Sequence, residues 1–158
     1  MRRSSKSSNA PPGGAGPSPE PVDCTCLQVR KAARRVTMIY DECLAPHGLT
    51  ITQFGMLAHI KRMDGIGMGA LSEKLVMDPT TLTRNIRPLV RRNLVELTPD
   101  PDDRRARVLR LTPAGRSAVD QARPGWEQAQ RRIAQALGQE DNRQLTRVID
   151  RLLSRADL

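Results

Sequence analysis

Residues 78–93 read DPTTLTRNIRPLVRRN, and this stretch decides the fold. Asp78 can accept backbone N–H bonds at a helix N-cap, and Pro79 suits the first helical position because no donor is needed there. The following apolar residues recur at helical spacing and are expected to be buried: Leu82, Ile86 and Leu89. Asn93 can adopt the left-handed conformation that ends a helix. We therefore predict a helix over 79–92.

The segments on either side of this helix are expected to form a short helix before it and two strands after it. The Gly-rich segment 64–69 is expected to be a loop that leads into a short helix over 70–76. After Asn93, loosely alternating residues predict two strands, 94–98 and 107–111, joined by a polar turn. A helix, a short turn, a second helix and a hairpin in this order are the outline of a winged helix-turn-helix, in which the hairpin is the wing.

The polar face of the helix over 79–92 is suited to DNA. An α-helix fits into the major groove, where base edges differ in their hydrogen-bond donors and acceptors. Burial of the apolar stripe turns five polar side chains outward: Thr80, Thr81, Thr83, Arg84 and Arg87. The hydroxyls suit phosphate or base contacts, and the two arginines suit guanine edges or phosphates. Arg91 and Arg92 extend the positive face, and Pro88 is expected to bend the second half of the helix. The alternative interpretation is a solvated face on an ordinary amphipathic helix.

The expected wing carries a second basic cluster. The residues that we expect to contact DNA from its turn and the start of its second strand are Asp103, Arg104, Arg105 and Arg107. Arginine inserted into a narrow minor groove meets an enhanced negative potential. Asp103 precedes Arg105 by two residues and can orient its guanidinium through a charge-assisted pair. The alternative is a solvated charged turn with weak surface ion pairs.

Three further apolar stripes lie outside this lobe. They fall on 26–43, 118–137 and 145–153, each with helical spacing. The dipeptide Pro124-Gly125 is expected to kink or briefly break the second of these helices. The stripes exceed what one small winged lobe can cover, so they need a partner chain.

The fold class that follows is mainly α with a small β-hairpin wing. We expect a disordered tail over 1–21, because this segment is rich in Pro and Gly and has almost nothing apolar to bury. We expect an N-terminal dimerisation helix within 22–48, a winged helix-turn-helix over 49–112 that opens with a helix capped by Thr50, and C-terminal dimerisation helices over 113–158.

Composition narrows the function classes. The 158 residues carry a net charge of +9, with 22 Arg, 4 Lys and only three aromatic residues. A basic balance indicates a polyanionic partner, and planar guanidinium groups suit base edges. The scarcity of aromatics argues against RNA stacking, which leaves a general basic nucleic-acid-binding protein as a lesser alternative. No apolar run is long enough to cross a bilayer and no secretory leader is recognisable, so we expect a cytoplasmic protein without a membrane partner.

Catalysis is not expected. The sequence has no Gly-rich phosphate loop. Its two histidines, His47 and His59, have neither metal-ligand spacing nor a convincing place in a Ser-His-Asp set. We therefore expect no cofactor and no catalytic residue.

Several segments together resemble the multiple-antibiotic-resistance regulator (MarR) family. Thr80-Thr81-Leu82-Thr83-Arg84 is similar to its recognition helix, and residues 103–112 match its wing signature of Asp, Arg, Leu and Thr. Residues 48–54 and 112–115 are similar to the helix starts before and after these elements. Asn93 stands where the family usually has Gly, and Pro88 is not general in the family. The resemblance implies an obligate homodimer on a pseudo-palindromic operator, with half-sites about one helical turn apart.

The resemblance also implies a repressor that is released by a small effector or by cysteine oxidation. In the ligand interpretation, an aromatic or phenolic acid binds among the first two helices and the helix after the wing. Candidate lining residues are Tyr40, Phe54, Met56, His59 and Met63. The alternative is that the two aromatics are plain core and that His59 is solvated or satisfied.

In the thiol interpretation, Cys24 and Cys26 at the start of the first helix respond to oxidants or bind a soft metal. A helix N-terminus and the nearby Arg30 and Lys31 favour the thiolate. Residues two apart in a helix point to different sides, so a Cys24–Cys26 disulfide needs non-helical backbone. Cys26 and Cys43 are too far apart along one helix to pair within it. The alternative is that Cys26 and Cys43 pack as small apolar residues.

Overall fold

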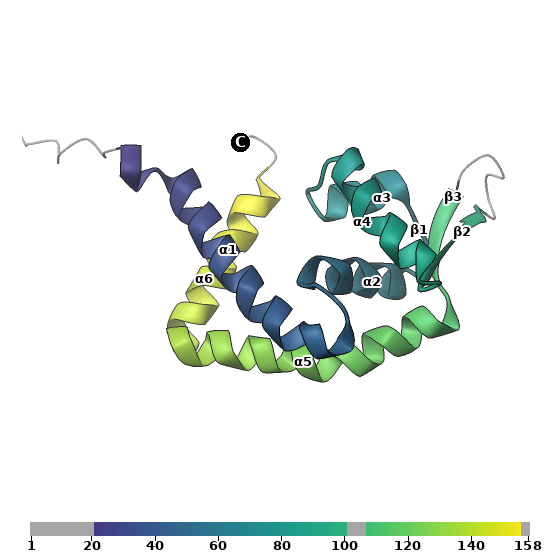
Figure 1. The fold of residues 1–158 in the computed structure, drawn as a ribbon. Helices are drawn as coiled ribbons and strands as arrows, with labels where there is room; N and C mark the ends of the chain where they lie inside the picture. The colour runs from purple at the N-terminus through teal and green to yellow at the C-terminus, as the bar shows by residue number, and fades with distance from the viewer. Residues whose placement is uncertain (1–20, 101–106, 156–158) are drawn as a thin grey trace, which may run out of the picture. The chain divides into compact units, whose positions relative to one another are not determined.

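The structure, a computed structural model, describes residues 21–100 and 107–155 (Figure 1). The chain forms two compact units, 1–33 and 34–158, with the boundary inside α1. The elements in chain order are η1 (Pro21–Asp23), α1 (Thr25–Leu44), η2 (Ala45–His47), α2 (Ile51–Met63), β1 (Ile66–Gly67), α3 (Met68–Lys74), α4 (Pro79–Arg91), β2 (Val95–Pro99), β3 (Arg107–Leu111), α5 (Pro113–Leu137) and α6 (Gln139–Ser154). The predicted mainly helical fold with a small hairpin is confirmed. The expected tail lies outside the described residues except for Pro21, which begins η1.

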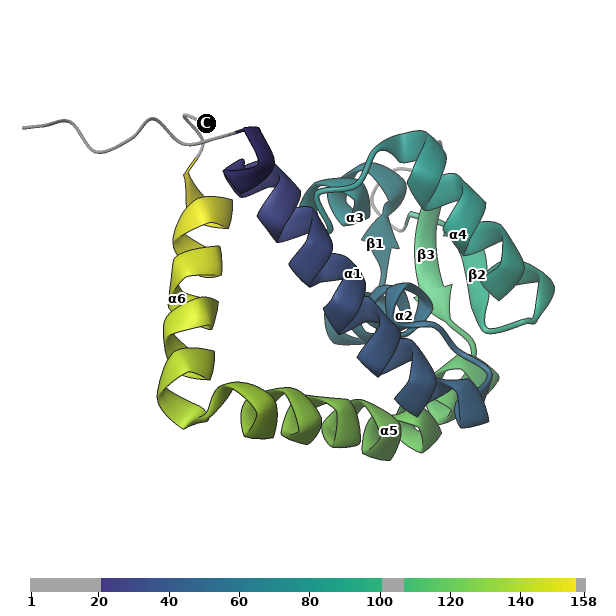
Figure 2. The same cartoon turned by 60° about the vertical axis from the view of Figure 1, so that its left-hand side comes forward.

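A three-stranded antiparallel sheet replaces the expected two-stranded hairpin. Its order is β1-β3-β2, so β3 lies in the middle (Figure 2). The expected loop over 64–69 is therefore wrong in part, because Ile66 pairs with Leu109 and Gly67 with Val108. Two residues are too few to show an alternating pattern, and the pairing is with a strand far along the chain. As a result α3 begins at Met68, before the expected residue 70.

We refer to residues 49–112 as the winged body. Its core is formed by apolar side chains from α2, α3, α4 and the sheet. Fully buried examples are Leu57, Ile60, Leu71, Leu82, Leu89, Val95 and Leu109. The stripe predicted for the helix over 79–92 is confirmed, since its three apolar residues are all buried. This core fixes the orientation of α4, and thereby the face that α4 presents to solvent.

Local hydrogen bonds set where the helices begin. Thr50 and Gln53 form a reciprocal capping box at the start of α2, as the expected Thr50 cap requires. Asp78 accepts a 2.9 Å hydrogen bond from the backbone N–H of Thr81 at the start of α4. Asn93 has a φ of 54°, which confirms the left-handed residue predicted after α4.

The junction between the wing and α5 is tight. The Thr112 hydroxyl donates to the carbonyl of Asn93 at 2.6 Å and accepts from the backbone N–H of Gly115 at 3.0 Å. A Cβ on Gly115 would lie 1.9 Å from the carbonyl oxygen of Leu94. Only glycine permits this close approach, which locks the first turn of α5 against the end of the hairpin.

Helix α5 is continuous through Pro124 and Gly125, so of the expected kink or brief break the break is wrong. Gly125 is buried, and a Cβ at this position would lie 2.5 Å from the carbonyl oxygen of Cys43. The close packing of α5 on the end of α1 stabilises the helix where its own hydrogen bonding is interrupted. After Gly138, whose φ is 78°, α6 turns away from the axis of α5 (Figure 2).

None of the residues of α6 is buried. Its apolar stripe lies open to solvent, with exposed fractions of 43–62% at Leu145, Val148, Ile149, Leu152 and Leu153. Residues 21–33, the described part of the first unit, are also exposed wherever their burial is described. No helix within the described ranges is long and apolar enough to span a membrane.

Candidate nucleic-acid interface and pocket

The first two turns of α4 and the turn beyond them present a row of exposed polar side chains. Thr80, Arg84 and Arg87 are exposed and follow one another at spacings of four and three residues. That spacing places them on one face of the helix, opposite the buried stripe. The face combines one hydroxyl with two guanidinium groups, which can donate to base edges or phosphates.

The other two predicted residues of α4 are less free. Thr81 and Thr83 are half-buried. The Thr83 hydroxyl donates to the carbonyl of Pro79 at 2.8 Å, so it is left as an acceptor. Hydrogen bonds from Thr81 hold the pKa of Asp78 below its ordinary value. Thr81 and Thr83 therefore shape the N-terminal turns of α4, while Thr80 and the two arginines face outward.

Arg92 has a structural partner. Its Nη1 donates to the carbonyl of Gly48 at 2.9 Å, which ties the end of α4 to the turn before α2. Arg91 is exposed. Of the two arginines expected to extend the positive face, Arg92 also ties α4 to the rest of the protein.

The wing is only partly described. Arg107 is exposed on β3, where it pairs in register with Pro99. Asp103, Arg104 and Arg105 lie outside the described residues. Among the described residues, Pro99 at the end of β2 lies directly opposite Arg107 at the start of β3.

An ion-pair node joins the base of the wing to two helices. Asp64, the C-cap of α2, accepts from Nη2 of Arg116 on α5 at 2.7 Å. Arg110 on β3 donates to the backbone carbonyl of Asp64 at 2.5 Å. The hydrogen bond and charge of Arg116, with a smaller contribution from Arg110, hold the pKa of Asp64 below its ordinary value. The outgoing strand of the wing is thus tied to the end of α2 and to the start of α5.

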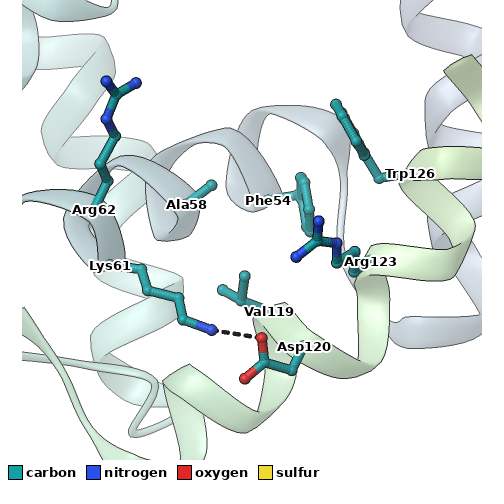
Figure 3. A pocket seen from close by; sticks show the side chains of 8 residues that line it. All are labelled: Phe54, Ala58, Lys61, Arg62, Val119, Asp120, Arg123 and Trp126. Atoms are coloured by element: carbon teal, nitrogen blue, oxygen red, sulfur yellow. Dashed lines mark hydrogen bonds and ion pairs between the residues drawn. The ribbon is translucent and has the colours of Figure 1, made fainter.

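A pocket of about 370 Å³ lies between α2 and α5. Its lining residues are Phe54, Ala58, Lys61, Arg62, Val119, Asp120, Arg123 and Trp126 (Figure 3). The rings of Phe54 and Trp126 are stacked, with centroids 6.3 Å apart. Lys61 reaches across the pocket to Asp120, with Nζ 2.5 Å from Oδ1 (Figure 3). An aromatic wall and several charged groups thus meet in one cavity.

Of the five residues predicted for an effector pocket, Phe54 lines this cavity and the other four do not. Met56 is fully buried in the core, and Nδ1 of His59 lies 2.8 Å from the carbonyl oxygen of Gly55. Met63 is 46% exposed. Tyr40 is half-buried against the core, and this burial raises the pKa of its phenol.

The residues that sequence reasoning missed are mainly charged. Lys61 and Asp120 are 59 positions apart, and no local pattern reveals that they meet. Trp126 falls within the apolar stripe expected over 118–137, but its side chain is only half-buried and lines the pocket. Its size and polar N–H were the signals that could have marked it as a pocket residue.

The three cysteines have different environments. Cys24 and Cys26 are exposed, and Cys43 is buried. Cys24 immediately precedes α1, whereas Cys26 lies in its first turn. Nη1 of Arg132 lies 3.6 Å from Sγ of Cys43, and hydrogen bonds to Cys43 and Glu42 raise the pKa of Arg132. Within the described part of a single chain, no group of three or more His, Cys, Asp or Glu residues could hold a metal ion.

Known proteins share this architecture. A model of the MarR family matches residues 47–106. The HTH-type transcriptional repressor NicR of Pseudomonas putida is 31% identical over 112 residues, covering 66% of this chain and 71% of NicR. The transcriptional regulator MOSR of M. tuberculosis, whose structure was solved in complex with DNA, is 35% identical with a TM-score of 0.73, over 82% of this chain and 93% of that one.

A third likeness concerns the fold alone. BpsR of Bordetella bronchiseptica, whose DNA binding is regulated by 6-hydroxynicotinic acid, has a TM-score of 0.79 at 22% identity, over 87% of this chain and 99% of that one. The winged body, the exposed polar face of α4 and these similarities lead to one assignment. The chain belongs to the MarR family of DNA-binding transcriptional regulators.

Proposed function

We propose that this protein is a homodimeric repressor that binds a pseudo-palindromic operator and is released by a small aromatic acid. In this proposal residues 49–112 bind DNA, and the segments 22–48 and 113–158 form the dimer. The single observation that carries the proposal is the exposed face of α4. Thr80, Arg84 and Arg87 lie along it, on the side of the helix opposite the buried apolar stripe. Asp103, Arg104, Arg105 and Arg107 add minor-groove contacts from the wing.

The exposed apolar stripe of α6 supports a dimer. Five large apolar side chains on one helix face are between 43% and 62% exposed. Monomeric proteins rarely leave such a contiguous apolar patch open to water. A second copy carries the same stripe, so a two-fold interface covers both at once.

The pocket between α2 and α5 supports an anionic aromatic effector. The stacked rings of Phe54 and Trp126 supply a flat apolar wall, and Lys61 and Arg123 supply positive charge. The regulation of BpsR by 6-hydroxynicotinic acid, an aromatic acid, is consistent with this class. The pocket of this chain lies between α2, which belongs to the winged body, and α5, so a bound ligand contacts both helices.

The DNA-binding part of the proposal is tested by selecting ligands from a random pool of duplexes. We expect an enriched pseudo-palindrome with half-sites about one helical turn apart. Titration with salt should show a specificity ratio of about 10³ or more over random duplex. A steep salt dependence with little preference among sequences would instead indicate a general basic nucleic-acid-binding protein.

The effector part can be tested with the chain's own fluorescence. Trp126 is the single tryptophan of the chain and lines the pocket, so its emission reports on occupancy directly. We expect 6-hydroxynicotinate or benzoate to change this emission saturably and to release the operator over the same concentration range. Release of the operator without any change in Trp126 emission would place the effector elsewhere.

A second candidate is thiol-based sensing by Cys24 and Cys26. It is favoured because both thiols are exposed and Cys24 immediately precedes the first residue of α1. If peroxide releases the operator through these thiols, Cys24→Ser and Cys26→Ser abolish the release. The buried Cys43 offers a matched control, because Cys43→Ser should leave the response intact. Release that persists in the first two variants contradicts this candidate.

A further inference from the structure

Two ion pairs cross from α2 to α5 side by side. Lys61 pairs with Asp120 at 2.5 Å, and Asp64 pairs with Arg116 at 2.7 Å. Lys61 and Asp64 are three residues apart at the end of α2, and Arg116 and Asp120 are four apart on α5. Residues at these spacings are neighbours on a helix surface, so the two pairs are consecutive links between the same two helices. We refer to them as the α2–α5 ladder.

The two links of the ladder touch different parts of the molecule. Lys61 and Asp120 line the pocket. Asp64 also receives the guanidinium of Arg110 on β3, the strand that leads out of the wing tip. A ligand in the pocket therefore contacts the first link, and a displacement of the second link alters the contact between Asp64 and Arg110 on β3.

We propose that the α2–α5 ladder couples the pocket to the wing: an organic anion that pairs with Lys61 displaces Asp120, and the freed α5 shifts against α2 and repositions β3 through Arg116, Asp64 and Arg110. This inference rests on the proposed function, because it assigns the means by which a ligand in the pocket lowers the affinity for operator DNA.

The first link is suited to exchange. The Lys61 and Asp120 side chains are 33% and 62% exposed, so the pair contributes little stability in itself and water competes for both partners. A ligand carboxylate offers Lys61 the same chemistry, and its ring adds apolar contact with Phe54 and Trp126. Once displaced, the charged Asp120 carboxylate is hydrated by water, so the exchange leaves no unpaired charge buried.

The second link is suited to transmit the change. Asp64 is held in the left-handed region, at a φ of 50°, between the last turn of α2 and β1. Gly65 follows with a φ of 126°, and its Cα faces the Arg110 guanidinium so closely that a Cβ would lie 3.0 Å from Cζ. The Arg110 guanidinium therefore packs directly on the turn formed by Asp64 and Gly65 and is hydrogen-bonded to it.

The test uses the full chain, its selected operator and no effector. Asp120→Asn removes the carboxylate from the first link and imitates its displacement. General electrostatics predicts slightly tighter DNA binding, because a negative charge is lost. The ladder predicts the opposite sign, with operator affinity weaker by about three- to tenfold. Glu127→Gln is the matched control, since it removes the same charge from α5 but pairs only within that helix, with Arg123.

Two further variants separate coupling from a local defect. Asp64→Asn combined with Asp120→Asn should weaken binding by less than the product of the single effects, because both variants break one ladder. The exchange of Lys61→Asp with Asp120→Lys restores the first link with reversed polarity and should recover most of the affinity. Thermal melting shows whether each variant folds, and the exchange variant carries the test if Asp120→Asn does not.

The outcomes are distinct. Unchanged or tighter operator binding by folded Asp120→Asn overturns the ladder, as do independent effects of the two Asn variants or an exchange variant no better than Asp120→Asn. Failure of the unmodified chain to prefer any operator overturns the proposed function instead.

Discussion

The winged body and α6 are built from the same kind of amphipathic helix but are buried to opposite extents. In α4 the apolar stripe is at most 4% exposed, whereas in α6 the corresponding side chains are 43–62% exposed. Both helices have charged residues on the other face. The difference lies in what surrounds them, since α4 rests on a sheet and two helices and α6 makes its main contacts with α5.

This contrast teaches which part of the chain is complete by itself. Most helical stability in proteins comes from packing an apolar face, because an isolated helix is marginal in water. The winged body meets this condition within one chain. The stripe of α6 does not, so we assign its burial to a second copy.

The largest expected effect is a loss of stability of the winged body when its junction with α5 is disturbed. In Gly115→Ala the added Cβ would lie 1.9 Å from the carbonyl oxygen of Leu94, which is backbone and cannot swing away. We expect a loss of about 3 kcal/mol or more in the free energy of unfolding, measured by urea denaturation. Gly55→Ala is the control, because nothing lies within 4 Å of its Cβ position and the change should stabilise α2. Equal behaviour of the two variants would contradict the tight junction.

The next largest effect concerns α6. Leu152→Glu places a charge in the exposed stripe, which costs little in a monomer and much in a buried interface. We expect a shift from dimer to monomer in sedimentation and a loss of operator affinity of about 100-fold, since paired half-sites no longer act together. Gln144→Glu adds a charge to the polar face of the same helix and should preserve the dimer. A Leu152→Glu variant that sediments like the unmodified chain would remove α6 from the interface.

A smaller effect is expected on the recognition face. Arg84→Ala should weaken operator binding by about tenfold and relax base preference near one position of each half-site. Arg84→Lys keeps the charge but not the planar fork, so it should retain binding to random duplex while losing preference. A uniform loss across all sequences in the alanine variant would identify Arg84 as a phosphate contact.

The smallest effect follows from two carboxylates with lowered pKa values. Hydrogen bonds from Thr81 lower the pKa of Asp78, and Arg116 lowers that of Asp64. Their stabilising contribution is complete above the ordinary pKa of Asp and is lost as the pH falls through the lower folded-state pKa, below about pH 4. Melting temperatures between pH 6 and pH 2.5 should fall less steeply in Asp78→Asn, which cannot titrate there. Parallel curves would show that the caps do not contribute to acid unfolding.

The parts of the fold that sequence reasoning predicted have local causes. The Asp78-Pro79 start, the Leu82, Ile86 and Leu89 stripe and the left-handed Asn93 each act within a few residues of α4. These signals place the recognition face before any tertiary contact is known.

The parts that it missed have distant causes. The two residues of β1 become a strand only because β3 lies beside them, and α5 continues through Pro124 because Gly125 packs against the Cys43 carbonyl. The pocket is equally non-local, since Lys61 on α2 and Asp120 on α5 are 59 positions apart in the sequence. Of the five residues predicted for an effector pocket only Phe54 lines this cavity, while the five predicted residues of α4 lie at exposed or half-exposed positions; the role of both sets stays a prediction.

The most direct test of the account is the native mass of the protein bound to its selected operator. One chain weighs 17.5 kDa, and we expect two chains on one duplex, with no stable complex on a shuffled duplex of the same length. This result requires both a dimer and sequence preference. One chain per operator, or equal binding to the shuffled duplex, would contradict the account.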